Sequence, residues 1–158
     1  MATIYEEIRE DHEKHRELLN RLAETHGDTE ERRNAWNAFY YDVKAHAAAE
    51  EETFYSKIME KPDGQDDARH SVSEHKEMDD IMEELNSMGF DNPGWLTRFK
   101  TLKHDYEHHM EEEENEVFAR AKKVVGEEDN DAYGKRFLDR KEKELGLVQK
   151  KKADHLED

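Results

Sequence analysis

Two histidine–glutamate pairs with the same spacing are the residues of this sequence that could carry chemistry. They are His46-Ala-Ala-Ala-Glu50 and His109-Met-Glu-Glu-Glu113. On a helix, residues four apart project from one side, so each pair could offer an imidazole and a carboxylate to one metal ion. A single pair of this kind in so acidic a chain is more typical of a solvated ion pair. Further ligands are therefore needed before the pattern indicates a metal site.

Those ligands come from an internal repeat, in which residues 1–60 correspond to residues 64–123 at an offset of 63. The offset relates six potential ligands in pairs: His12 with His75, His46 with His109, and Glu50 with Glu113. Apolar positions repeat as well, for example Leu22 with Leu85. Burying four imidazoles and two carboxylates without a metal would cost several kcal/mol, and no basic residue is placed to offset that cost. The repeat therefore predicts a dinuclear metal centre with carboxylate bridges.

Helices must position these residues, because the apolar side chains recur at helical spacing. We expect helices over residues 3–23, 28–60, 66–88 and 92–125, separated by breaks at Gly27, at Pro62 and Gly64, and at Gly89, and a short fifth helix over residues 130–145. A helical hairpin cannot bury its apolar stripe alone, so two repeated hairpins should pack as an all-α four-helix bundle. This divides the chain into a bundle with the metal site, residues 1–125, and a C-terminal helix with a charged tail, residues 126–158.

The predicted ligands interrupt the apolar stripes of the second and fourth helices. The stripes read Trp36, Phe39, Val43, His46, Glu50 and Phe54, and Phe99, Leu102, Tyr106, His109, Glu113 and Val117. Each step is three or four residues, so every histidine and glutamate of these stripes should point inward rather than to water.

Composition restricts the partners and the location. A net charge of −17 disfavours nucleic acid and anionic membranes, which are both polyanions, and suits cations. The absence of cysteine excludes disulfides and thiolate metal sites and leaves imidazole and carboxylate as ligands. The N-terminus has no basic flank followed by an apolar run, and no segment reaches the roughly 20 apolar residues of a membrane span. We therefore expect a cytoplasmic protein.

The ligand set, with its flanking acidic residues, resembles the haemerythrin family in the form called the HHE cation-binding domain. The resemblance extends over about residues 4–122 and includes Asp11-His12, Glu50-Glu51 and the run from Glu113 to Phe118. It implies an up-down-up-down bundle and a cofactor of two iron ions with a bridging oxo or hydroxo species, in which both glutamates bridge the metals. Ferritin-type bundles use Glu-x-x-His, which does not occur in this sequence.

One departure from this family bears on function. Oxygen-carrying haemerythrins have His-x3-His on the third helix, whereas His75 is followed at that spacing by Asp79, and Glu113 stands where carriers usually have aspartate. Both irons would then keep an exchangeable position, which favours chemistry with oxygen, peroxide or nitric oxide over reversible oxygen carriage.

Three hypotheses follow. The first is a di-iron protein that reacts with oxygen or peroxide, with a catalase- or peroxidase-like activity in peroxide decomposition. The second is a module that senses or stores iron, oxygen or nitric oxide without turnover. The third is a metal-free structural bundle.

Several residues near the predicted ligands have more than one possible role. His15 could hydrogen-bond a ligand, act as a seventh ligand or be a satisfied core histidine, and Tyr106 could hydrogen-bond a metal-bound oxygen or simply pack in the core. His104 and His108 point away from the core face and fit solvation or adventitious metal. The basic run over residues 135–152 should dock on its own bundle through Phe137, Leu138, Leu145 and Leu147, with a protein partner or a membrane as alternatives.

Overall fold

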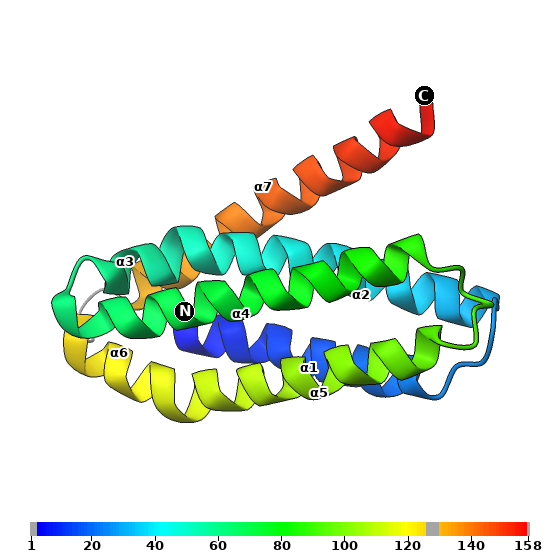
Figure 1. The fold of residues 1–158 in the computed structure, drawn as a ribbon. Coiled ribbons are helices and arrows are strands. Elements are labelled where there is room, and N and C mark those ends of the chain that lie inside the picture. The colour runs from blue at the N-terminus through cyan, green and yellow to red at the C-terminus, as the bar shows by residue number, and fades with distance from the viewer. Residues whose placement is uncertain (1–2, 126–129, 158) are drawn as a thin grey trace.

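The computed structural model describes residues 3–125 and 130–157, and all the regular elements in those ranges are helices. Four antiparallel segments form an up-down-up-down bundle (Figure 1). They are α1 (Ile4–Ala23); α2 (Glu30–Glu50) with η1 (Glu51–Tyr55) and α3 (Ser56–Met59); α4 (Pro62–Ser87); and α5 (Trp95–Glu112) with η2 (Glu113–Val117) and α6 (Phe118–Val125). A further helix, α7 (Asn130–Glu157), follows. The predicted all-α bundle is confirmed.

Local chemistry sets the helix boundaries of the bundle. The starts of its third and fourth segments differ from the prediction. The hydroxyls of Thr3 and Thr29 cap α1 and α2, and Gly27 takes a φ of 61° in the loop between them. Helix α4 begins at Pro62 rather than at residue 66, because proline fits the first helical turn as well as ending the previous helix. Helix α5 begins at Trp95, since the side-chain oxygen of Asn92 accepts a hydrogen bond from the Gly94 amide in the preceding turn.

The second and fourth segments each contain a stretch of π-helix directly beside a predicted glutamate ligand. Segment η1 follows Glu50, and η2 begins at Glu113. In an α-helix, a residue five positions after each glutamate would lie about 140° away from it. The wider π turn instead brings Tyr55 and Phe118 into the core, where they are 1% exposed. The sequence prediction treated these segments as regular α-helix and missed both π turns.

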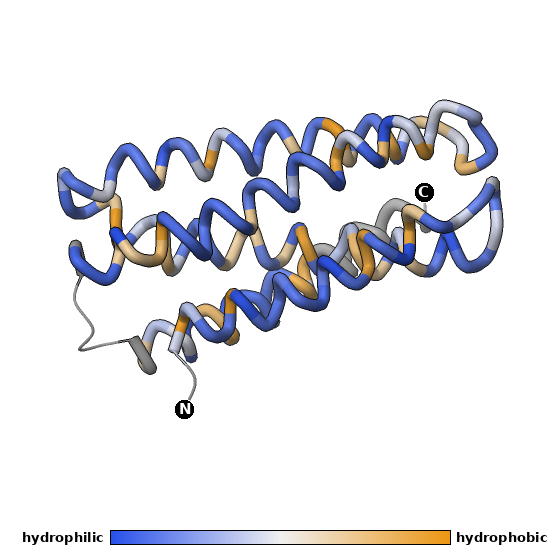
Figure 2. Tube along the Cα trace, turned by 90° about the horizontal axis from the view of Figure 1, so that it is seen from below, coloured by the Kyte–Doolittle hydropathy of each residue, from blue (hydrophilic) through white to orange (hydrophobic). Residues whose placement is uncertain are grey.

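The hydrophobic core consists of two clusters with the predicted ligands between them. One cluster surrounds Leu22, Trp36 and Phe99 near the loops that end α1 and α4, and the other surrounds Ile8 and Phe54 at the opposite end. Hydrophilic residues dominate the rest of the trace, as Figure 2 shows. The buried histidines and glutamates thus form a polar layer between two apolar ones.

Helix α7 packs against α1, α2 and η1, and then diverges from the bundle toward the C-terminus (Figure 1). It runs to Glu157, well beyond the predicted end at residue 145. Phe137 is fully buried, but Leu138 and Leu147 are each 44% exposed, so the predicted apolar edge is only partly correct. In the described part of the chain, no helix is both long and apolar enough to cross a membrane.

Candidate metal centre

The six predicted ligands meet at mid-height in the bundle as two overlapping groups. The first group comprises His12, His46, Glu50 and Glu113, and the second comprises Glu50, His75, His109 and Glu113. Within each group, one ligand atom per residue lies within 4.8 Å of every other. Each group therefore has two histidines of its own, and the two groups share both glutamates.

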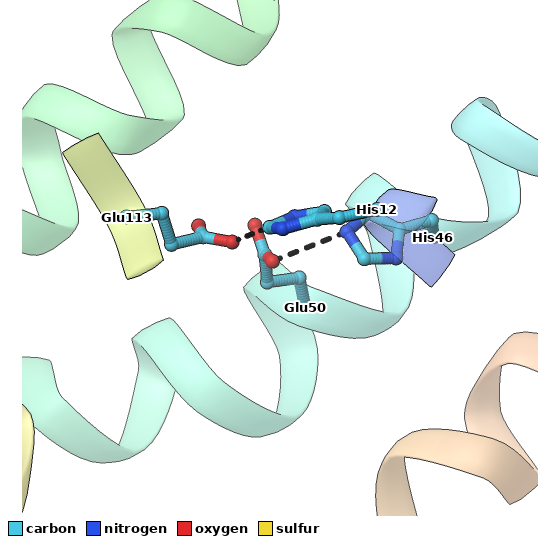
Figure 3. Close-up of side chains that lie close together, drawn as sticks. All are labelled: His12, His46, Glu50 and Glu113. Carbon is cyan, nitrogen blue, oxygen red and sulfur yellow. Dashed lines mark ion pairs between the residues drawn. The ribbon is translucent and has the colours of Figure 1, made fainter. Parts of the chain in front are cut away.

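Each glutamate reaches histidines from both groups. Glu113 Oε1 lies 3.1 Å from His12 Nε2, and Glu113 Oε2 lies 3.6 Å from His109 Nε2. Glu50 Oε2 lies 3.2 Å from His46 Nε2, and Glu50 Oε1 lies 3.1 Å from His75 Nε2. Figure 3 shows the first group, with His12 of α1 facing Glu113 across the bundle and His46 one turn before Glu50 on α2. Both carboxylates are thus arranged to bridge two positions.

Several of these converging atoms have no hydrogen-bond partner although they are buried. They include both oxygens of Glu50, Oε1 of Glu113 and Nε2 of His12. These atoms approach one another without the orientation of a hydrogen bond, and unpartnered polar atoms are costly inside a protein. Four imidazole nitrogens and two carboxylates aimed at common points are a donor set suited to transition-metal cations. The residues therefore fit a pair of metal ions.

A second set of carboxylates lies beside the outer nitrogens of the four histidines, with hydrogen bonds to His46, His75 and His109 and a longer contact to His12. His46 Nδ1 lies 2.7 Å from Asp11, His109 Nδ1 lies 2.9 Å from Glu74, His75 Nδ1 lies 3.2 Å from Glu51, and His12 Nδ1 lies 3.5 Å from Glu114. A ring that donates Nδ1–H to a carboxylate keeps its Nε2 lone pair free for a metal. When neutral, these rings would therefore present the Nε2 lone pair to the centre.

The outer carboxylates follow the same internal repeat as the inner ligands, and the sequence analysis did not assign them a role. The offset of 63 carries Asp11 onto Glu74 and Glu51 onto Glu114. The signal was present in the repeat, but acidic residues are so frequent in this chain that a matching pair of them carries little information.

Neighbouring charges shift the pKa values of the centre. Burial lowers the pKa of His46, but the Glu50 charge and the hydrogen bond to Asp11 outweigh it and raise the pKa to about 9. Burial also lowers the pKa of His75, but the close Glu50 carboxylate and the hydrogen bond to Glu51 outweigh it and raise the pKa to about 10. The same histidines hold the pKa of Glu50 well below its ordinary value against the effect of burial. Without a metal, His46 and His75 are therefore imidazolium rings beside the ionised Glu50.

Tyr55 is a further polar contact of the centre, and the sequence alone did not indicate this role. Its fully buried hydroxyl donates a hydrogen bond to Glu113 Oε2, and burial raises its pKa well above the ordinary value. The repeat partner of Tyr55 is Phe118, which has no hydroxyl. The hydroxyl therefore breaks the symmetry between the two halves.

His15 and Tyr106 lie beside the centre and form a hydrogen bond with each other. The Tyr106 hydroxyl lies 2.8 Å from His15 Nδ1, and His15 Nε2 lies 2.6 Å from Asp42. Burial lowers the pKa of His15 to about 4 despite the Asp42 carboxylate, so the neutral ring donates to Asp42 and accepts from Tyr106. Both ring nitrogens are occupied, which matches the alternative of a satisfied core histidine rather than a seventh ligand.

The remaining polar residues weighed in the sequence lie outside both groups. Asp79 is 2.5 Å from Lys44 at the surface, so α4 contributes only His75 to the six residues. His104 contacts its neighbour Asp105, and His108 contacts Glu112; both histidines are exposed.

A cavity of about 320 Å³ lies between α2 and α4 and reaches the centre. Val43, Ala47, Val72 and Met82 form apolar parts of its wall, and His46 and His75 form part of its floor, together with Tyr106. A small molecule could approach both groups through this cavity.

Comparison with known proteins places the chain in a family. The model of the Hemerythrin HHE cation binding domain matches residues 3–121. A crystal structure of a Hemerythrin HHE cation binding domain-containing protein from Mycobacterium kansasii superposes with a TM-score of 0.86 at 20% identity, covering 96% of this chain and 92% of that one. At this identity, the likeness bears on the fold alone.

A curated protein also matches in sequence. It is a protein of Nostoc sp. (strain PCC 7120) named DNA nickase, with 26% identity over 140 residues. The match covers 89% of this chain and 39% of the Nostoc protein, so this chain corresponds to less than half of its relative.

Proposed function

This chain belongs to the Hemerythrin HHE cation binding domain family, and on that premise we propose that it is a non-haem di-iron protein that reacts with oxygen or peroxide. The observation that carries the proposal is the sharing of Glu50 and Glu113 by two groups that each have two histidines. Such a set suits two cations a short distance apart, bridged by carboxylates.

The proposed ligands of the irons are the six residues predicted from the sequence, His12, His46, Glu50, His75, His109 and Glu113. Two irons held there, with the proposed bridging oxo or hydroxo species, would supply redox chemistry between the ferrous and ferric states. Each position would have four protein ligands, and iron in sites of this type accommodates more than four. Room therefore remains for a small molecule at either position.

The surrounding residues prepare the centre for such a molecule. Asp11, Glu51 and Glu74 hold the rings of His46, His75 and His109 with Nε2 inward, and Glu114 lies beside His12 Nδ1. The two apolar clusters exclude water from above and below the polar layer, while the cavity between α2 and α4 admits a small solute. The Tyr55 hydroxyl, which donates a hydrogen bond to Glu113, is a proton donor beside the shared glutamates.

Turnover is proposed in preference to reversible oxygen carriage because of α4. A carrier would use a second histidine one turn after His75, but that position is Asp79, which pairs with Lys44 at the surface. Neither position of the centre is thus filled by an additional imidazole. The alternative is a module that binds iron, oxygen or nitric oxide for sensing or storage without turnover.

The deciding experiment starts from protein loaded anaerobically with ferrous iron. We expect about two irons per chain, oxidation within seconds in air that is not reversed under vacuum, and consumption of hydrogen peroxide in a parallel assay. Recovery of the ferrous optical spectrum on deoxygenation, with no loss of peroxide, would instead establish the sensing or storage alternative.

Variants test the ligand assignment. Glu50→Ala and Glu113→Ala should each reduce the iron content to below half, because each glutamate belongs to both groups. His104→Ala and His108→Ala are matched controls on the exposed face of α5 and should leave the iron content unchanged. Equal iron losses in all four variants would rule out the assignment.

We propose no nucleic-acid partner, because the net charge of −17 opposes approach to a polyanion. Since the Nostoc relative is named DNA nickase, a plasmid-nicking assay of the iron-loaded protein tests this directly. A cytoplasmic location and the absence of a protein partner for α7 stay predictions from the sequence.

A further inference from the structure

The two halves of the centre obey one repeat, but their surroundings differ, and the difference lies in helix α7. This helix packs on α1, α2 and η1, which carry or adjoin His12 and His46. Among the described residues, no equivalent helix covers α4 and α5, which carry His75 and His109. The internal repeat therefore relates the predicted ligands but not the helices that cover them.

Helix α7 contacts the His46 side of the centre in two ways. The Phe137 ring is fully buried and lies edge-on to the His46 ring, with 5.5 Å between the ring centroids. Lys141 Nζ lies 2.8 Å from Asp11 Oδ1, and the other oxygen of Asp11 holds His46 Nδ1. The Lys141 side chain is only 12% exposed, so this chain of contacts is shielded from water.

Lys141 also keeps two carboxylates together. Its Nζ lies 3.0 Å from Asp42 Oδ1, and Asp42 is already held by the neutral ring of His15. Without the lysine, the charges of Asp11 and Asp42 would repel each other in a region of low solvent access. Asp11 could then turn away, and His46 would lose the group that fixes its orientation.

The other outer carboxylate of this half is held in the same manner. Glu114, which lies beside His12, forms ion pairs with Arg16 and Arg9. In the second half, Glu51 is 39% exposed and pairs with His75, and Glu74 pairs with His109 and the exposed His70. Within the described residues, neither Glu51 nor Glu74 has a lysine or arginine partner.

We propose that α7 makes the two metal positions unequal: Lys141 positions His46 through Asp11, so that the ion between His12 and His46 is released more slowly than the ion between His75 and His109. This inference rests on the proposed dinuclear centre. The physical reason is that a metal ion dissociates when one of its ligands rotates away from it. A histidine rotates less often when its partner carboxylate is held by an ion pair and the ring is buried under another helix.

The test measures iron release from the ferrous protein to a ferrous chelator under anaerobic conditions. In the wild type we expect two phases of one iron each, with rates at least tenfold apart. Lys141→Met should accelerate the slow phase about tenfold and leave the fast phase unchanged, and Lys141→Arg should restore most of the difference. Mössbauer spectra of ⁵⁷Fe-loaded protein give a second readout, in which Lys141→Met should alter one of two signals.

The chain offers a matched control in Lys14. Its Nζ also lies 3.1 Å from Asp42 but makes no contact with Asp11, and its side chain is 57% exposed. Lys14→Met should therefore leave both phases unchanged. If Lys141→Met does not fold, Phe137→Leu removes the contact on the His46 ring and should accelerate the same slow phase.

Three results would overturn the inference: one common rate for both irons, equal acceleration of both phases by Lys141→Met, or the same effect from Lys14→Met. A protein that binds fewer than two irons would instead contradict the proposed function. The two failures are therefore distinguishable.

Discussion

Each inward histidine is contacted at both ring nitrogens, and this determines what the centre does without metal. Nε2 faces a shared glutamate and Nδ1 faces an outer carboxylate, so protons and metal ions compete for Nε2. The pKa of His46 is raised to about 9 and that of His75 to about 10, so both rings hold a proton at neutral pH until a metal displaces it.

The stability of the metal-free protein should therefore fall in alkaline solution. Because the folded pKa values of His46 and His75 exceed the ordinary 6.5, their stabilising effect is complete below about pH 6.5 and is lost as the pH rises through 9 and 10. His15, with its pKa lowered to about 4, acts in the opposite sense, and its effect is lost as the pH falls from 6.5 toward 4. We expect maximal stability of the metal-free form near pH 6.5 and a loss of several kcal/mol by pH 10.

Urea unfolding at pH 6.5, 8 and 9.5, with and without iron, measures this effect. In the iron-loaded form, the metals of the proposed centre would bind neutral imidazoles. Its free energy of unfolding should therefore not fall between pH 6.5 and 9.5. Parallel pH profiles for the two forms would contradict the protonation of these histidines.

The π turns allow one helical segment to carry both a proposed ligand and the core residues that follow it. A π turn accommodates one extra residue within a helix without rotating the segments on either side. In η1 it brings Tyr55 to the same side as Glu50; Phe54 and Tyr55 of this turn are buried, and so is Ile58 after it. The matching turn at η2 does the same for Glu113 and Phe118.

Deletions distinguish a π turn from a regular helix. Removing the exposed Glu52 should convert η1 to α-helix and keep both flanks in register, so the free energy of unfolding should change by less than about 2 kcal/mol. Removing the exposed Ala38 from the regular part of α2 should rotate one flank by about 100° and expose core residues such as Phe39, at a cost above about 4 kcal/mol. Chemical unfolding compares the two, and similar losses would argue against the π turn.

At the scale of the whole molecule, the centre is a polar layer in the middle of a small hydrophobic core. Two apolar clusters lie on either side of the residues that would hold the metals. A metal that binds only the folded state stabilises it by mass action, on the order of 4 kcal/mol at a thousandfold excess over the dissociation constant. Folding and metal binding should therefore be strongly coupled.

Chelation should lower the melting temperature of the iron-loaded protein by on the order of 10 °C, since about 1 kcal/mol shifts the midpoint of a domain of this size by 2–4 °C. Differential scanning calorimetry at fixed ionic strength measures the shift, and the Glu113→Ala variant serves as the control that should show little change on chelation. A metal-free protein that melts with the loaded one would show that the histidines and glutamates satisfy each other.

Helical periodicity and a constant offset of 63 are properties of the chain alone, and they were enough to predict an all-α bundle, its internal repeat and six candidate ligands. In the structure, His12 and His75 lie beside the two His-x3-Glu pairs, and the assignment of all six as metal ligands stays a prediction. The sequence could not assign Asp11, Glu51, Glu74 and Glu114, since only the crossing of helices decides which of 42 acidic residues meets which imidazole. Nor could it show that Lys141 reaches Asp11 from 130 residues away, because a contact of that range depends on how α7 packs across α1 and α2. Local spacing thus predicted the six residues, and tertiary packing decided what contacts them and which half of the centre is covered.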